Sequence, residues 1–299
     1  MAEITTAQVK ELRERTGSGM MECKRALQET GGDIEAAVEL MRKAGQAKAD
    51  KKASRVAAEG LIVVRQTAGA VAMAEINCET DFVTKNDDFR AFAAEVAETV
   101  LREGPADLDA LLAAVMANGQ SVEQNRRDCI AKIGENINVR RGVRLASSTG
   151  VLGSYLHGTR IGVLVELDGG NADLAKDIAM HVAASRPLCV SADQVPAELI
   201  AKEKEIYAAQ AVDEAKGKPA NVIDKIIEKI VEGKLRKYFE SATLLGQMFV
   251  KDDKQSVGDL LESRKARVIR FERFELGEGI EKKSSDFAAE VAAARGDDD

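Results

Sequence analysis

Two stretches of this chain, Gly60–Ile76 and Val151–Leu167, share a pattern of two short β-branched runs separated by a turn. Such runs between glycines and turn residues are typical of β-strands, so each stretch predicts a β-hairpin. A helical pattern follows each hairpin, from Asp87 to about Leu101 and from Asn171 to about Ser185. Hairpins that alternate with helices predict an α+β fold, in which helices cover small sheets.

The two hairpins also align with each other. Ala72–Ile76 matches Val163–Leu167, with apolar residues and one glutamate in corresponding positions. Each half of the chain then has another helix and a further strand pattern, at Ile137–Leu145 and Arg267–Leu276. We interpret this as a diverged repeat that gives two related sheet-plus-helix core subdomains, at 55–148 and 149–281.

The residues before the first hairpin predict a separate bundle of three short helices. Thr5 and Gln8 have the spacing of a capping box that opens the first helix. Glycines break the chain twice, and Asp33 is placed to cap the third helix. From Arg42 to Arg55, six basic residues accompany one acid and large apolar residues are absent. This run is typical of a solvated helix end or linker, so we place a helical module with a basic linker at 1–54.

The second core subdomain is interrupted by a predicted antiparallel helical hairpin at 196–237. Pro196 suits the first turn of a helix, and Lys216–Pro219 breaks that helix. A wide stripe of Ile and Val at helical spacing follows, which indicates a second helix that packs against the first. Near the end of the chain, Ser285–Arg295 predicts a short amphipathic helix, which makes 282–299 a C-terminal helical module.

The composition argues against several classes of function. With 43 basic and 50 acidic residues the net charge is −7, so the chain lacks the cationic field that nucleic-acid-binding proteins usually carry. The four cysteines are scattered without a C-x-x-C pair, which predicts reduced thiols. No apolar stretch reaches membrane-spanning length and the N-terminus lacks a signal-peptide profile. We therefore expect a cytoplasmic protein without membrane contact.

The motifs of common enzymes are missing from the sequence. There is no G-x-x-x-x-G-K-[ST] loop for phosphates and no G-x-G-x-x-G run. Neither His157 nor His181 accompanies a nucleophile or a metal-ligand cluster, and His181 lies in an apolar helical run where packing in the core is the expected role. We expect no catalytic residue, metal or cofactor, and an unrecognised enzyme is kept only as a weak alternative.

Five short runs carry a more specific signal. They are Leu12–Lys24, Asn77–Val83, Lys132–Ile137, Gly153–Gly158 and Asp286–Ala292. In the same order along the chain, these runs resemble motifs of the bacterial elongation factor Ts family. One four-residue match is weak support, but five matches in order are strong support.

The resemblance implies a guanine-nucleotide exchange factor that binds elongation factor Tu in its GDP-bound and nucleotide-free forms. It also implies that the N-terminal module is ubiquitin-associated-like. In such proteins Thr80, Asp81, Phe82 and Val83 bind the partner, where the Asp-Phe pair presses into the nucleotide domain and disturbs the magnesium and phosphate site. Judged from the local pattern alone, a strand ends and a turn starts in this run, and Phe82 would instead anchor the core.

The resemblance assigns further partner contacts to Arg13, Met20 and Met21 of the N-terminal module and to His157 at the second hairpin turn. It leaves the use of the helical hairpin open, since the hairpin can form homodimers, contact the partner or brace the core. A different function is a ribosome-associated or ubiquitin-like-binding adaptor that uses the N-terminal bundle alone. Nucleic-acid binding through Lys43–Arg55 is disfavoured, because the net charge is negative and no aromatic residues interleave with the basic ones.

Overall fold

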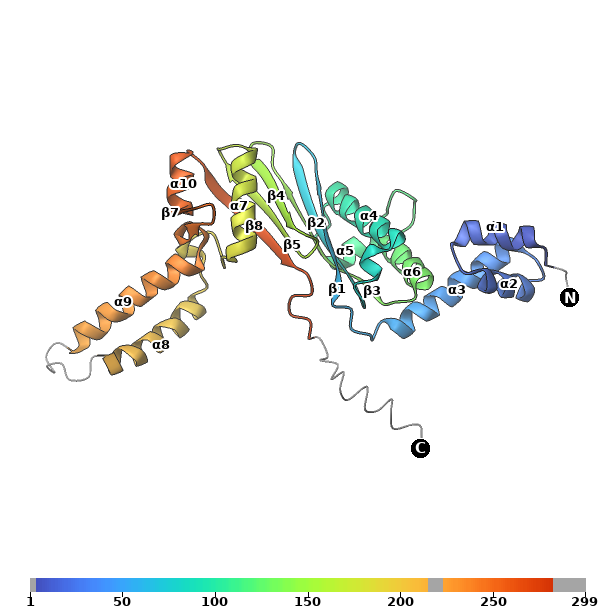
Figure 1. Ribbon diagram of the computed structural model, residues 1–299, viewed down its shortest axis with the longest axis horizontal. Coiled ribbons are helices and arrows are strands. Elements are labelled where there is room, and N and C mark those ends of the chain that lie inside the picture. The colour runs from blue at the N-terminus through green and yellow to red at the C-terminus, as the bar shows by residue number, and fades with distance from the viewer. Residues whose placement is uncertain (1–3, 215–222, 282–299) are drawn as a thin grey trace, which may run out of the picture. The chain divides into compact units, whose positions relative to one another are not determined.

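The computed structural model describes residues 4–214 and 223–281, and Figure 1 shows its elements. The fold is mixed, with α-helices and small antiparallel sheets, which confirms the α+β prediction. The chain divides into two compact units: in the described residues, the first contains 4–63, 73–143 and 275–281, and the second contains 64–72 and 144–274. Across the described ranges, no helix is long and apolar enough to cross a membrane.

The first unit begins with three helices whose ends follow the sequence signals. They are α1 (Thr6–Thr16), α2 (Met20–Glu29) and α3 (Ile34–Lys52). Thr5 and Gln8 form the expected capping box, and Asp33 accepts a hydrogen bond from the amide of Ala36. Gly17 ends α1 in the left-handed conformation, with a φ of 65°, which a residue without Cβ adopts at little cost.

The three helices enclose a small core of their own. Its buried members are Leu12, Cys23, Ala26, Leu27 and Ala37. The third helix continues to Lys52, so most of the basic run is helical and the loop before the first strand is short.

A three-stranded sheet in the order β1-β2-β3 follows, and three helices accompany it. The strands are β1 (Glu59–Gln66), β2 (Ala70–Cys78) and β3 (Ile137–Ala146), and the helices are α4 (Asp87–Glu103), α5 (Leu108–Ala113) and α6 (Val122–Ile133). Every residue of the central strand β2 is buried. A Cβ at Gly142 of β3 would lie 2.8 Å from Val100 and 3.2 Å from Leu111, so glycine there allows α4 and α5 to pack closely on the strand.

A buried carboxylate in β2 fixes the segment that follows the last strand. Glu75 has no exposed surface and accepts hydrogen bonds from Arg140 (2.9 Å), Arg141 (2.7 Å) and the amide of Gly277 (2.8 Å). Burial acts to raise the pKa of Glu75, but these donors outweigh it and the pKa is lowered. The stabilisation by the ionised group is therefore present at neutral pH and is lost only as the pH falls through that lowered value.

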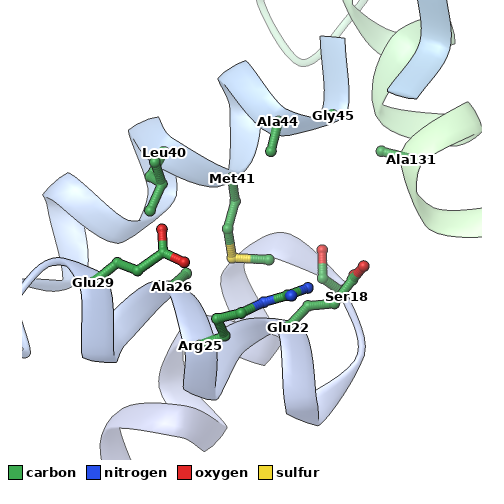
Figure 2. A pocket seen from close by; sticks show the side chains of 10 residues that line it. All are labelled: Ser18, Glu22, Arg25, Ala26, Glu29, Leu40, Met41, Ala44, Gly45 and Ala131. Atoms are coloured by element: carbon green, nitrogen blue, oxygen red, sulfur yellow. The ribbon is translucent and has the colours of Figure 1, made fainter. Parts of the chain in front are cut away.

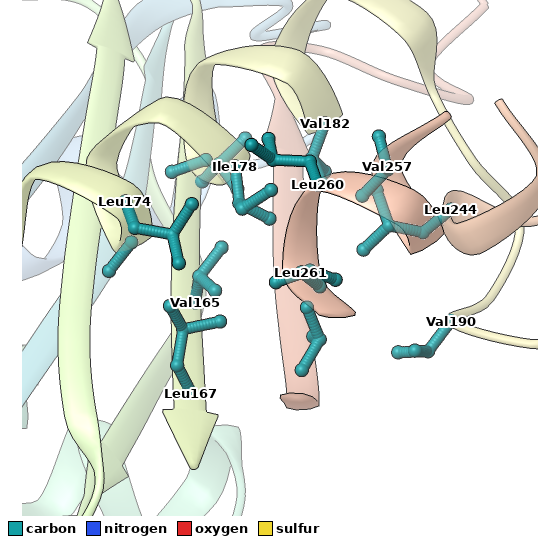
Figure 3. Close-up of a cluster of buried hydrophobic side chains, with 14 of the residues drawn as sticks. Val165, Leu167, Leu174, Ile178, Val182, Val190, Leu244, Val257, Leu260 and Leu261 are labelled. Carbon is teal, nitrogen blue, oxygen red and sulfur yellow. The ribbon is translucent and has the colours of Figure 1, made fainter. Parts of the chain in front are cut away.

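The second unit contains a sheet in the order β4-β5-β8 together with the helices that cover it. Its elements are β4 (Val151–His157), β5 (Ile161–Asp168), α7 (Ala172–Ser185), the short pair β6 (Met248–Phe249) and β7 (Asp252–Ser256), α10 (Val257–Ser263) and β8 (Arg267–Glu275). Figure 3 shows the core, where Val165 of β5, Ile178 of α7 and Leu261 of α10 belong to one buried cluster. The two predicted hairpins are present as β1–β2 and β4–β5, and the predicted helices that follow them are α4 and α7.

His181 of α7 is a core residue, as predicted. Its side chain is fully buried, with Nε2 3.0 Å from Oε1 of Gln247, and its Nδ1 accepts the amide of Val250 at 3.2 Å. Burial lowers the pKa of His181, although the contact with Gln247 acts in the opposite direction. The neutral imidazole therefore joins α7 to the β6–β7 pair.

The inserted hairpin consists of α8 (Ala197–Glu214) and α9 (Ile223–Ala242), which lie side by side in Figure 1. Lys234 of α9 donates to Gln210 (2.8 Å) and Glu214 (2.7 Å) of α8. The second helix contains Gly233 without a break and ends at Ala242, five residues beyond the expected end at 237. The predicted break at 216–219 and the predicted C-terminal helix at 285–295 lie outside the described residues.

Candidate partner-binding site

The chain between β2 and α4 forms a short, well-defined turn. Phe82 has helical backbone angles (φ −60°, ψ −39°) and begins a 3₁₀ turn over Val83–Lys85. The carbonyl of Asp81 accepts two hydrogen bonds from Thr84, at 3.1 Å from its amide and 2.6 Å from its hydroxyl. Asn86 then caps α4 by accepting the amides of the first turn. The backbone of the loop is therefore fixed from Asp81 to the start of the helix.

This turn exposes one apolar side chain and buries the next. Phe82 is 77% exposed, whereas Val83 is 7% exposed and packs inward. Asp81 is also exposed, and Thr80 is held by two hydrogen bonds to Glu135. A large aromatic side chain that is exposed to solvent on an ordered backbone is typical of an anchor residue in a protein–protein interface.

The thiol at the base of the loop has a structural role. Cys78 is fully buried and its Sγ donates to the carbonyl of Thr80 at 3.1 Å. Burial, with the nearby carboxylate of Glu135, raises the pKa of Cys78 to about 12. A thiol with that pKa stays protonated at neutral pH, so it supports the turn and is a poor nucleophile.

The N-terminal module presents a second apolar feature. Met20 and Met21 form the start of α2 directly after Gly19, and they are 57% and 77% exposed. Because both side chains are exposed, both are accessible to another protein. Arg13 of α1 is exposed as well. The flexible, polarisable side chain of Met suits an adaptable contact with another protein.

His157 is the last residue of β4, at the turn of the second hairpin, and it is exposed. Its Nδ1 lies 3.5 Å from the hydroxyl of Tyr155. Thr80, Asp81, Phe82 and Val83 form one continuous loop of the first unit, and Arg13, Met20 and Met21 lie on the module of that same unit. His157 belongs to the second unit.

The module also contains a cavity of about 200 Å³ between α2 and α3, which Figure 2 shows. Met41 points into it, and Glu22, Arg25 and Glu29 of α2 lie along its wall. Neither exposed methionine of α2 belongs to its lining. Among residues 4–214 and 223–281, no group of three or more His, Cys, Asp or Glu residues is placed to hold a metal ion.

The loop between β2 and α4, residues 79–86, carries Phe82 and is called the Phe82 loop. Local sequence patterns did not reveal the residues that support it. Glu135 accepts hydrogen bonds from Thr80, and Glu79 accepts the amide of Asn136, which lies 57 residues away in the sequence. The available signal was the Lys132–Ile137 run, in which Gly134 ends α6 with a φ of 87° and turns the following residues toward the loop.

Comparisons with known proteins agree with the resemblance seen in the motifs. The family described as Elongation factor TS matches residues 79–278. A protein of Methylococcus capsulatus named Elongation factor Ts is 62% identical over 292 residues, which cover 97% of this chain and 98% of the relative. Proteins of the same name from Thioalkalivibrio sulfidiphilus and Legionella pneumophila are 60% and 52% identical, over 97% and 98% of this chain and 98% and 99% of their own lengths.

Proposed function

The chain belongs to the elongation factor Ts family, and on that premise we propose how it carries out guanine-nucleotide exchange on elongation factor Tu during translation elongation. In this proposal the Phe82 loop enters the nucleotide domain of the partner and disturbs its magnesium and phosphate site. The N-terminal module binds the same domain through Arg13, Met20 and Met21, and His157 makes a further contact. The observation that supports this most is the exposed Phe82 on a rigid backbone.

The chemistry of nucleotide binding makes a wedge of this kind effective. Magnesium requires near-ideal octahedral geometry at about 2.0–2.1 Å, so a small displacement of a ligand weakens its hold on GDP. Burial of a Phe side chain supplies roughly 2–3 kcal/mol, which can stabilise a shifted helix in the partner. Thr80 and Asp81 orient the loop, and Val83 anchors it in the core of this protein.

Thermodynamic linkage determines how the cycle ends. By whatever factor this protein lowers the affinity of its partner for GDP, the nucleotide lowers the affinity of the partner for this protein by the same factor. Binding of a new nucleotide therefore releases the factor. Exchange forms and breaks no covalent bond, so the protein needs no catalytic residue, metal or cofactor of its own.

The finer architecture belongs to the same proposal. We propose that 1–54 is a ubiquitin-associated-like module, that 55–148 and 149–281 are related core subdomains, that 196–237 is an insertion in the second, and that 282–299 is a C-terminal helical module. The shared order of hairpin and following helix in β1–β2–α4 and β4–β5–α7 supports the relation between the subdomains. We expect no contact with nucleic acid or membrane.

The direct test is release of fluorescent GDP from purified elongation factor Tu. Addition of this protein in amounts far below those of the partner is expected to accelerate release by orders of magnitude. An unchanged rate with a folded, matched partner contradicts the proposed function. Binding of the partner without acceleration would instead favour the adaptor alternative.

The helical hairpin is expected to be separable from exchange. Its two helices pack on each other, Ala211 of α8 and Leu235 of α9 are buried, and Lys234 donates hydrogen bonds across the pair, so the helices can be removed together. Replacement of 196–237 by a short Gly/Ser linker should retain most exchange activity, and analytical ultracentrifugation of the same variant tests whether the hairpin forms homodimers. Lost activity in a folded variant would assign the hairpin an essential contact with the partner.

A further inference from the structure

We infer that Glu135 and Asn136 are positioning residues that hold the Phe82 loop in the conformation that presents it. This inference rests on the proposed exchange function. Neither residue needs to touch the partner, because both act through the two residues that precede Asp81. The effect is to order the loop before the partner arrives.

Glu135 fixes Thr80 with both of its carboxylate oxygens. Oε2 accepts the amide of Thr80 at 3.0 Å, and Oε1 accepts the hydroxyl of the same residue at 2.6 Å. One side chain therefore restrains both the backbone and the side chain of Thr80. Hydrogen bonds to an ionised acceptor are shorter and stronger than neutral ones, so Glu135 firmly attaches the N-terminal side of the loop.

Asn136 completes the attachment in the opposite direction. Its amide donates to Oε1 of Glu79 at 2.6 Å, so the pairs 79–80 and 135–136 each donate to and accept from the other. Arg55 lies 3.4 Å from the second oxygen of Glu79. The four residues thus form a reciprocal clamp, defined here as Glu79, Thr80, Glu135 and Asn136.

The clamp also contacts the residues that follow the N-terminal module. The side chain of Asn136 is fully buried, and its Nδ2 donates to the carbonyls of Arg55 (2.7 Å) and Ala53 (3.5 Å). Ala53 is the C-cap of α3, the helix that leads from the module into the core. One buried residue therefore joins the exit of the module to the loop that carries Phe82.

An ordered loop is advantageous because a flexible one loses conformational freedom on binding. That loss reduces the net free energy gained when Phe82 is buried in the partner. Because the clamp orders the loop when the protein folds, the loop loses little further conformational entropy on binding. Loosening the clamp should therefore slow exchange even though Phe82 itself is unchanged.

A double-mutant cycle on the full-length protein tests the clamp, with release of fluorescent GDP from elongation factor Tu as the readout. Thr80→Val removes the hydroxyl bond to Glu135 and should lower the rate constant of nucleotide exchange about tenfold, and Glu135→Ala removes both bonds to Thr80 and should lower it at least as much. The double variant should be no slower than Glu135→Ala, since that change already removes the hydroxyl bond that Thr80→Val breaks. Thr80→Ser keeps the hydroxyl, so its rate constant of nucleotide exchange should stay close to the wild-type value and above that of Thr80→Val.

The matched control is Glu123→Ala on α6. Glu123 accepts two 2.6 Å hydrogen bonds, from Arg126 and Arg127, and so loses comparable contacts away from the loop. We expect the rate constant of nucleotide exchange with Glu123→Ala to stay within about twofold of the wild-type value. Amide hydrogen exchange on the free protein gives an independent readout. Glu135→Ala should raise the rate of amide hydrogen exchange in the peptide that spans 79–86, whereas Glu123→Ala should not.

The outcomes separate this inference from the proposed function. If the wild-type protein does not accelerate GDP release, the proposed function fails. If the wild type is active but Glu135→Ala retains its rate and its amide protection, the clamp inference alone is wrong. Additive losses in the double variant would also overturn it, because Thr80 would then act on the partner independently of Glu135.

Discussion

Replacing Phe82 with alanine is expected to slow GDP release from elongation factor Tu by about 30-fold or more while the free protein keeps its melting temperature. The side chain is mostly exposed, and surface substitutions usually change the free energy of unfolding by less than about 0.5 kcal/mol. Burial in the partner is worth roughly 2–3 kcal/mol, and each 1.4 kcal/mol corresponds to about a tenfold change. The loss should therefore appear in exchange and not in folding.

Three further variants make this result specific. Phe89→Ala removes a fully buried side chain seven residues away and should cost about 3–5 kcal/mol of stability. Val115→Ala removes an exposed apolar side chain that has no place in the mechanism, and it should alter neither property. Asp81→Ala should lose less activity than Phe82→Ala, because the loop is held by the backbone carbonyl of Asp81.

Melting temperature and GDP release are to be measured on the same samples. A large fall in the melting temperature of Phe82→Ala, with a proportionate loss of activity, would return Phe82 to a structural role. Normal exchange by a stable Phe82→Ala variant would remove the wedge from the mechanism.

The sequence was sufficient for elements that depend on neighbouring residues. Caps such as Asp33 and Asn171, and β-branched runs such as Ile161–Leu167, determine local backbone geometry through contacts a few residues apart. These elements lie where the patterns placed them. The exception was the end of α9, where no local breaker exists and the helix ends as the chain enters the core at Thr243 and Leu244.

The candidate site was less accessible to local patterns because its supports are distant in sequence. The local pattern alone placed Phe82 in the core, whereas its neighbour Val83 is the buried residue. Which of two adjacent apolar residues is buried depends on the 3₁₀ turn and on the bonds to Asp81, and these leave no periodic pattern. Glu75 likewise has partners 65 and 202 residues away, so no window of sequence reveals that a buried carboxylate is satisfied.

Removal of the N-terminal module is expected to weaken binding of elongation factor Tu by about 100-fold while the rest of the protein remains folded. We expect Met20 and Met21 to account for this loss of affinity, since burial of each Met side chain in the partner is worth roughly 1.5–3 kcal/mol. The module has its own core, which supports its independence. Binding is to be measured by titration calorimetry with nucleotide-free elongation factor Tu.

Deletion of 1–54 has structural side effects that a point variant avoids, among them loss of the Ala53 carbonyl that accepts from Asn136. The last turns of α3 pack on α6, where Ala49 is buried and Lys52 donates to the carbonyl of Gly134. Truncation uncovers that surface of α6 and can lower stability for reasons unrelated to the partner. Met20→Ser combined with Met21→Ser leaves α3 in place and removes only the exposed apolar surface.

The double substitution should therefore reproduce most of the loss in affinity without the change in stability. Glu39→Ala is a suitable control, because it breaks an exposed ion pair with Lys43 on the same module, and such pairs contribute at most about 1 kcal/mol. If the double variant binds as tightly as the wild type while the deletion binds weakly, the methionines are not the contact, and the loss comes from Arg13 or from the uncovered face of α6. If both bind normally, the module has a function other than holding elongation factor Tu, and the adaptor alternative gains support.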